Sequence, residues 1–138
     1  MRKLLVISAL LLFAGIAFGQ TLNKGGILMV HEWQVTVDDA TAKQMQEYWE
    51  KNLIPLANKL FPEAETYIVK GIGADNQNAI GSAWYYKSMD DLRKYFNEDG
   101  TPTEAGGVAL AEIMPTVEEM MAKFGEFSFV ARDWIILK

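Results

Sequence analysis

The chain of 138 residues contains no cysteine and only one histidine. Without thiols it forms no disulfide, so a domain of this size has to gain its stability from packing or from association with another chain. Structural zinc sites are built mainly from cysteine and histidine, and this supply is too small for one. We therefore expect no metal site.

Basic residues are also few, with 13 lysines and arginines against 18 acidic residues and a formal net charge of −5. The basic residues form no cluster along the sequence. Such a chain repels a phosphate backbone, because binding to nucleic acid depends on lysine and arginine that neutralise phosphates. A nucleic-acid partner is not expected.

Long hydrophobic runs are lacking outside the N-terminus. Residues 4–18 form one uncharged apolar run that follows Arg2 and Lys3, with Ala17 and Gly19 at the positions that a signal peptidase inspects. This layout is typical of a secretory signal peptide, and the run is too short for a membrane-spanning helix. We expect residues 1–19 to be removed between Gly19 and Gln20, and the protein to be exported to the periplasm or secreted.

Removal of this segment leaves 119 residues with a net charge of −7, because it carries two basic residues and no acid. The hydrophobic share then falls to about 46%, an ordinary value for a globular domain. Residues 20–26 are polar and contain glycine, which favours a flexible lead-in. Residues 27–138 are expected to form one domain around one core.

Hydrophobic spacing divides the domain into six elements. Residues 27–37, 65–73, 79–87 and 127–137 are rich in β-formers and are predicted strands, with a hairpin loop at 74–78. Residues 41–60 have helical spacing, and Pro55 predicts a kink near residues 51–54. A second helical region starts after Ser88, breaks at residues 97–101, and resumes at 103–124, where Pro115 should interrupt it.

The order β-α-β-β-α-β predicts an α+β, ferredoxin-like fold with sheet order 4-1-3-2 and all helices on one face. The first and last strands carry apolar residues on both faces. A sheet that is apolar on both faces needs cover on both. Helices cover one face, and a second copy of the sheet is the natural cover for the other, so we expect a homodimer. The apolar residues concerned are Leu28, Val30, Met29, Trp33, Val35 and Val37 in the first strand and Phe127, Phe129, Val130, Trp134, Ile135 and Ile136 in the last.

The element order, the length, a first strand that runs into Asp38-Asp39-Ala40-Thr41 and an aromatic last strand resemble the dimeric α/β-barrel superfamily. The resemblance covers residues 27–137 and is to the antibiotic-biosynthesis-monooxygenase-like and NIPSNAP-like branches. It implies a dimeric α/β barrel. The superfamily includes cofactor-independent oxygenases, haem-degrading enzymes, polyketide cyclases and proteins without assigned activity, so the fold constrains the function weakly.

The haem-degrading members use an axial histidine on the second helix, whereas residues 88–124 contain none. We therefore expect no haem and no other bound cofactor. His31, in the first strand, resembles the early histidine of the cyclase-like members and is a candidate general base. Those members use a second histidine that this chain lacks. A hydrogen-bonded or partly exposed strand histidine is the structural alternative.

Glu32 is a second catalytic candidate, on the opposite face of the strand from His31. A structural or interfacial ion pair between Glu32 and Arg132 of the last strand is the alternative. Aromatic residues on several elements are candidates for an apolar ligand pocket in one gap between sheet and helices. Core and dimer-interface packing is the alternative for these residues. The candidate ligand-binding residues are Trp33, Trp49, Tyr67, Trp84, Tyr86 and Trp134.

Two functions remain open at this point. The first is an exported homodimer that binds a small hydrophobic or aromatic ligand and acts as a cofactor-independent monooxygenase or a cyclase-like enzyme. The second is a non-catalytic structural or binding module whose aromatic residues form only core and dimer interface. An aromatic pocket that reaches His31 favours the first function, and a closed sheet–helix gap favours the second.

Overall fold

The computed structural model describes residues 22–34, 37–72, 79–125 and 128–138. The expected signal peptide, the hairpin loop at 74–78, Val35 and Phe127 lie outside the described residues. Four strands and two helical regions follow one another in the predicted order. They are β1 (Ile27–Gln34), α2 (Asp39–Tyr48), η1 (Trp49–Leu53), α3 (Ile54–Leu60), β2 (Ala64–Lys70), β3 (Ile80–Tyr86), α4 (Met89–Arg93), α5 (Glu104–Phe124) and β4 (Ser128–Ile135).

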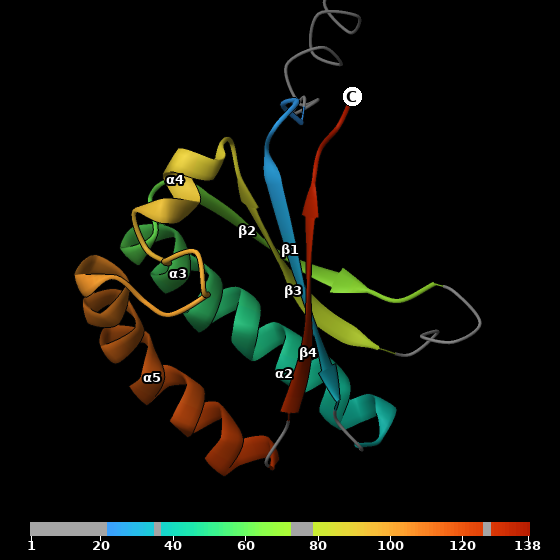
Figure 1. Ribbon diagram of the computed structural model, residues 1–138. Coiled ribbons are helices and arrows are strands. Elements are labelled where there is room, and N and C mark those ends of the chain that lie inside the picture. Colours follow the sequence, from blue (N-terminus) through green and yellow to red (C-terminus); the bar gives the residue numbers. More distant parts are fainter. Residues whose placement is uncertain (1–21, 35–36, 73–78, 126–127) are drawn as a thin grey trace, which may run out of the picture.

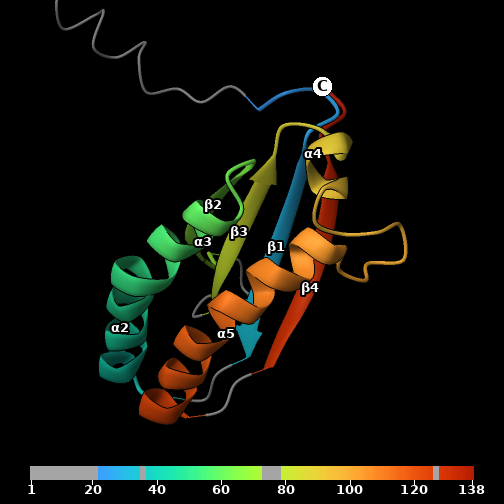
Figure 2. The same cartoon turned by 90° about the vertical axis from the view of Figure 1, so that its left-hand side faces the viewer.

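The strands form one antiparallel sheet in the order β2-β3-β1-β4, which confirms the predicted ferredoxin-like topology. The helices lie together on one side of this sheet (Figures 1 and 2). The strands end earlier than predicted, and β1 stops at Gln34, before Val37. Asp38 caps the start of α2, because its carboxylate accepts a hydrogen bond from Thr41 N at 2.8 Å.

Pro55 disturbs the first helical region where the sequence predicts a kink. The residues before it, η1, form a π-helical turn in which Ile54 N donates to Trp49 O. Pro55 has no backbone N–H, and its ring would collide with the carbonyl four residues earlier in a regular α-helix. The wider turn accommodates the proline, so the chain continues as α3 instead of ending.

Pro115 has a smaller effect than expected, because α5 runs unbroken through it. Pro115 and Ala111, whose carbonyl loses its donor, are both exposed, so that carbonyl is open to water. The second helical region is well capped. Ser88 Oγ accepts from Asp91 N at 3.1 Å, and Thr103 Oγ1 accepts from Gly106 N at 3.2 Å.

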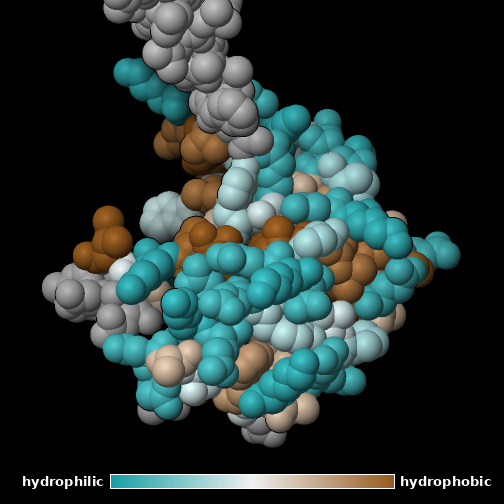
Figure 3. All heavy atoms as spheres, turned by 180° about the vertical axis from the view of Figure 1, so that it is seen from behind, coloured by the Kyte–Doolittle hydropathy of each residue, from teal (hydrophilic) through white to brown (hydrophobic). Residues whose placement is uncertain are grey.

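The core lies between the helices and the sheet. Its most completely buried large side chains are Tyr86, Phe61, Met45, Leu53 and Met120. Seen from behind, the outer surface is largely hydrophilic, with hydrophobic residues in separate patches (Figure 3). Among the described residues, no helix is long and apolar enough to cross a membrane.

The end of the predicted lead-in pairs with the end of β4. Gly25 N donates to Ile136 O at 2.7 Å, and Ile136 N donates to Gly26 O at 2.8 Å. Asn23 N donates to Tyr85 Oη at 2.6 Å. The two ends of the folded domain are therefore neighbours.

Candidate functional site

The alternation of side chains along β1 places His31 on the face that the helices cover. Paired residues in an antiparallel sheet point to the same side. His31 is paired with Ser82 on β3 and with Ala131 on β4, so these residues share its face. Glu32, one residue further, points to the opposite face. The two catalytic candidates therefore cannot act on one bound molecule within a single chain.

A cavity of about 260 Å³ lies between this face and the helices. It includes five of the eight candidate site residues, namely His31, Trp33, Trp49, Trp84 and Tyr86. The other lining residues come from β1, β3, β4, η1, α5 and the segments that follow α3 and α4. They are Met29, Leu53, Phe61, Ser82, Phe96, Leu110, Ile113, Met114, Val117 and Phe129.

His31 is the titratable base of the cavity. Its ring stacks on Phe129 with 5.2 Å between centroids, and it lies 6.4 Å from the Trp84 ring. Burial lowers the pKa of His31 below 6.5, and the negative charge of Asp133 only partly opposes this effect. The imidazole is therefore neutral at pH 7 and can accept a proton.

Two further polar groups lie in the cavity wall. Ser82 is 1% exposed and accepts a hydrogen bond from Trp84 Nε1 at 3.1 Å. Trp49 is also buried, and its ring lies against that of Trp33, with 3.7 Å between centroids. Among the described residues, Trp49 Nε1 has no hydrogen-bond partner. The cavity is thus aromatic, with a small number of polar atoms in its wall.

Strand β3 approaches β1 very closely beside this site. A Cβ atom at Gly81 would lie 2.3 Å from the backbone oxygen of His31. Only glycine permits this approach. Gly81 therefore helps to set the position of the His31 backbone.

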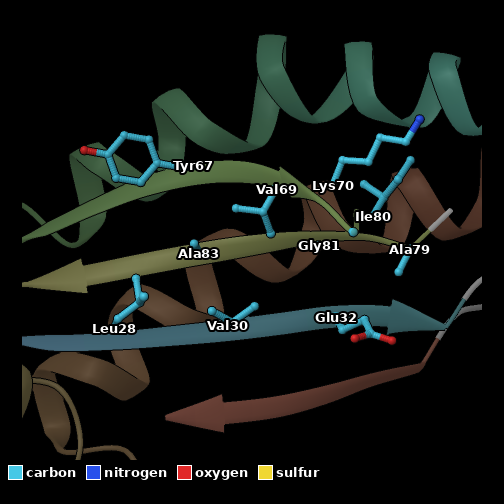
Figure 4. Close-up of a pocket in the computed structure, with 11 residues that line it drawn as sticks. Leu28, Val30, Glu32, Tyr67, Val69, Lys70, Ala79, Ile80, Gly81 and Ala83 are labelled. Atoms are coloured by element: carbon cyan, nitrogen blue, oxygen red, sulfur yellow. The ribbon is translucent and has the colours of Figure 1, made fainter. Parts of the chain in front are cut away.

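The opposite face of the sheet carries the remaining three candidates. Glu32 and Tyr67 line a groove of about 380 Å³, whose floor includes Gly81 and Ala83 (Figure 4). Trp134 is paired with Leu28 and so shares this face, where it is 58% exposed. The prediction of one aromatic cluster in a single sheet–helix gap is therefore wrong for Tyr67 and Trp134.

The predicted pairing of Glu32 with Arg132 is also wrong in register. Glu32 lies opposite Val130, and Arg132 lies opposite Val30. The register depends on where β4 begins after α5, and the sequence pattern does not define that residue to within two positions.

Sequence reasoning missed the part of the cavity wall that the second helical region provides. Leu110, Ile113, Met114 and Val117 were recognisable as an apolar helical stripe, but this spacing alone predicts only burial. Ser82 gave no signal in the sequence. The described part of the chain contains no group of three or more histidine, cysteine, aspartate or glutamate residues that could hold a metal ion.

Comparisons with known proteins agree with the fold. No protein-family model and no curated protein matches the chain. A dimeric ferredoxin-like protein from an uncultured marine organism is similar in structure, with a TM-score of 0.56, 8% identity, and coverage of 82% of this chain and 96% of the other. A NIPSNAP-like domain protein from Burkholderia xenovorans has a TM-score of 0.51 and 16% identity, covering 84% of this chain and 87% of the other.

A cofactor-independent oxygenase from Streptomyces nogalater is a more distant match, with a TM-score of 0.46 and 12% identity over 83% of this chain and 95% of the other. The NIPSNAP-like group that the sequence resembles thus occurs among its structural neighbours. At these identities the likeness shows the ferredoxin-like fold alone.

Proposed function

We propose that this protein binds a small aromatic compound in the cavity between the sheet and the helices. One observation carries the proposal: the cavity is walled by aromatic side chains and reaches the imidazole of His31. This arrangement is the one that favours a ligand over a purely structural module. Ligand sites are typically apolar hollows with a small number of placed polar groups.

The size of the cavity limits the ligand. An apolar cavity of about 150 Å³ holds a benzene molecule, and pockets for drug-sized ligands begin at about 300 Å³. A cavity of about 260 Å³ therefore suits a compound of one or two fused rings. Flat rings also match the tryptophan and phenylalanine faces that form the walls.

The chemistry that we propose starts with a proton transfer. Neutral His31 accepts the proton of a ring hydroxyl. The resulting phenolate can attack an electrophilic carbon of the same molecule in a cyclisation, or it can reduce dioxygen, so that one oxygen atom enters the ring as a quinone carbonyl and the other leaves as water. His31 would then act as general base in a cofactor-independent monooxygenase or cyclase-like enzyme. This reaction type rests on the resemblance of the sequence to those branches, and the binding proposal stands without it.

Calorimetric titration with 5-indanol, a two-ring phenol, tests the binding. We expect saturable binding to the native protein and binding to His31→Leu that is weaker by about fivefold to tenfold, since leucine has no acceptor and one hydrogen bond to the ligand is lost. Lys43→Gln, on the exposed surface of α2, is the control and should bind as the native protein does. Absence of binding to the native protein would leave the non-catalytic module as the function.

We further propose that a second copy of the chain covers the open face of the sheet. On this face Tyr67 is 42% exposed and Val130 37% exposed, beside Trp134. Leu28, Val30 and Val69 lie on the same face of the sheet. Isolated apolar residues are normal on a surface, but an apolar sheet face of this kind favours an interaction site. The marine protein of the same fold is dimeric.

The dimensions of the sheet agree with this assembly. Four strands at about 4.8 Å and seven or eight residues at about 3.3 Å give a face of about 500 Å². Two such faces bury about 1,000 Å² in projection, and more with side-chain relief, which reaches the range of specific interfaces. The face can also be self-complementary, because it carries both the exposed side chain of Trp134 and the groove whose floor includes Gly81 and Ala83 (Figure 4).

Light scattering on the purified chain tests the assembly. We expect twice the mass of one chain for the native protein and a single-chain mass for Val30→Lys, which places a charge in the middle of the face. Val108→Lys is the matched control, because Val108 is 57% exposed on α5, away from this face. A native monomer, or a dimer that tolerates Val30→Lys, would contradict the proposal.

We also propose that the protein works outside the cytoplasm, which rests on the signal-like sequence of residues 1–19. Mass spectrometry of the protein from the periplasmic and extracellular fractions should find a chain that begins at Gln20. An uncleaved chain confined to the cytoplasm would contradict export.

A further inference from the structure

The indole N–H of Trp49 is a buried donor on a residue that lines the cavity. The Trp49 side chain is only 6% exposed and lines the cavity with His31. Among the described residues its Nε1 atom has no hydrogen-bond partner. An unpaired buried donor costs free energy, because the group has given up its hydrogen bond to water without a replacement.

The local backbone makes this placement specific. Trp49 is the first residue of the π-helical turn η1, which Pro55 accounts for. Turns of this type are rare and occur frequently at functional sites, because they change the direction of a side chain relative to a regular α-helix. Trp49 is held there by the close contact of its ring with Trp33. The donor is therefore attached to a packed and defined part of the fold.

Trp84, another tryptophan of the cavity wall, has an indole N–H that is already hydrogen-bonded. Trp84 Nε1 already donates to Ser82 Oγ at 3.1 Å. Thr66 Oγ1 is also buried without a partner, but Thr66 does not line the cavity. Trp49 thus combines a buried unpaired donor with a position in the wall of the proposed ligand site.

We propose that the ligand of this cavity is an aromatic compound with an oxygen acceptor, such as a ring carbonyl, and that this oxygen accepts a hydrogen bond from Trp49 Nε1. The inference rests on the proposed function and narrows its ligand class. Hydrocarbon rings fill the cavity but leave the donor unpaired. Aryl ketones and related compounds fill it and satisfy the donor, so the protein selects them.

Two probes of similar shape test this selection. Indane and 1-indanone differ by one carbonyl oxygen, and 1-indanone has no donor of its own. We expect 1-indanone to bind more tightly in calorimetric titration. Trp49→Phe keeps an aromatic ring but removes the N–H, so it should weaken 1-indanone binding by about tenfold and change indane binding by less than twofold.

Trp134→Phe is the matched control. It removes the indole N–H of a tryptophan on the opposite face of the sheet, outside the cavity wall. This variant should retain the native preference for 1-indanone over indane. In the ligand-free state Trp49→Phe should melt no lower than Trp84→Phe, because it removes an unpaired donor, whereas Trp84→Phe leaves Ser82 without its hydrogen-bond partner.

Nuclear magnetic resonance of the native protein observes the bond without relying on a variant's fold. The four tryptophans give separate indole N–H signals, and Trp49→Phe or selective labelling assigns the signal of Trp49. We expect 1-indanone to shift this signal downfield and indane not to do so. Equal affinities, or an equal loss for both probes in Trp49→Phe, would overturn the inference while leaving the binding proposal intact. Failure of 1-indanone, indane and 5-indanol alike to bind would overturn both.

Discussion

Two neighbouring glycines in α5, Gly106 and Gly107, should respond in opposite ways to alanine. A Cβ atom at Gly106 would lie 2.0 Å from the backbone oxygen of Tyr95, whereas at Gly107 it would meet nothing within 4 Å among the described residues. Both variants gain helix propensity, by up to about 1 kcal/mol. Only Gly106→Ala has to move the helix, because an ordinary contact needs at least 3.4 Å.

The required movement also disturbs a hydrogen bond. The same Tyr95 oxygen accepts from Thr103 N at 2.8 Å, immediately before α5 begins. Inserting a methyl group into such a contact typically costs about 1–3 kcal/mol. Since the gain in helix propensity is shared, the two variants should differ by about this amount. For a domain of this size the difference corresponds to about 4–12 °C in melting temperature.

Thermal unfolding followed by circular dichroism measures this difference, with Gly107→Ala as the control. We expect Gly107→Ala to melt at or above the native temperature and Gly106→Ala to melt clearly below it. Gly106→Ala should also bind 5-indanol more weakly, because α5 contributes Leu110 and Ile113 to the cavity wall. Equal melting temperatures for the two variants would refute the close packing of α5 against Tyr95.

Three further predictions concern the site and its support. Because burial lowers the pKa of His31 from 6.5, its stabilising contribution is complete above pH 6.5 and is lost as the pH falls through the folded-state pKa. Urea unfolding from pH 7.5 to 5 should show this loss of stability in the native protein and a smaller loss in His31→Gln. Parallel curves of stability against pH would contradict the prediction. Thr103→Ala removes the N-cap of α5 and should cost about 1 kcal/mol in urea unfolding, a cost that an unchanged midpoint would disprove. Ser82→Ala leaves Trp84 Nε1 unpaired and should lower the free energy of unfolding by about 1–3 kcal/mol. Ser82→Thr keeps the hydroxyl and should recover part of this loss; equal stabilities for the two variants would contradict the prediction.

The topology of the sheet could be predicted because several signals in the sequence agree. Runs rich in β-formers and helical spacing of period 3.6 indicated the element order, and the short connections then left one arrangement. The effect of Pro55 was also predictable, since a missing N–H inside a helix has to be accommodated nearby. Pro115 shows the limit, because its effect depends on whether the affected carbonyl faces water, which is a property of the tertiary structure.

The candidate site was only partly predictable for a similar reason. Alternation separates His31 from Glu32 with certainty, but it does not tell which aromatic residues of other strands join His31. Trp84 joins it and Trp134 does not, because the register between strands decides the face of each residue. The contribution of α5 to the cavity wall depends on how this helix packs across the sheet. In the sequence, the apolar stripe of α5 cannot be distinguished from ordinary core residues.

The pairing of the chain ends has a mechanical consequence. The hydrogen bonds between Gly25, Gly26 and Ile136 place the start of β1 beside the end of β4. A force that pulls the two ends apart therefore loads the β1–β4 ladder in the unzipping geometry. The residue pairs break one after another, whereas a shearing force would load all of them together. Every residue of β4 is exposed in the single chain, so this strand has little packing to resist such a force. Peeling would proceed from Ile135 towards Phe129, the residue that stacks on His31, and the cavity would lose that wall only at the last step.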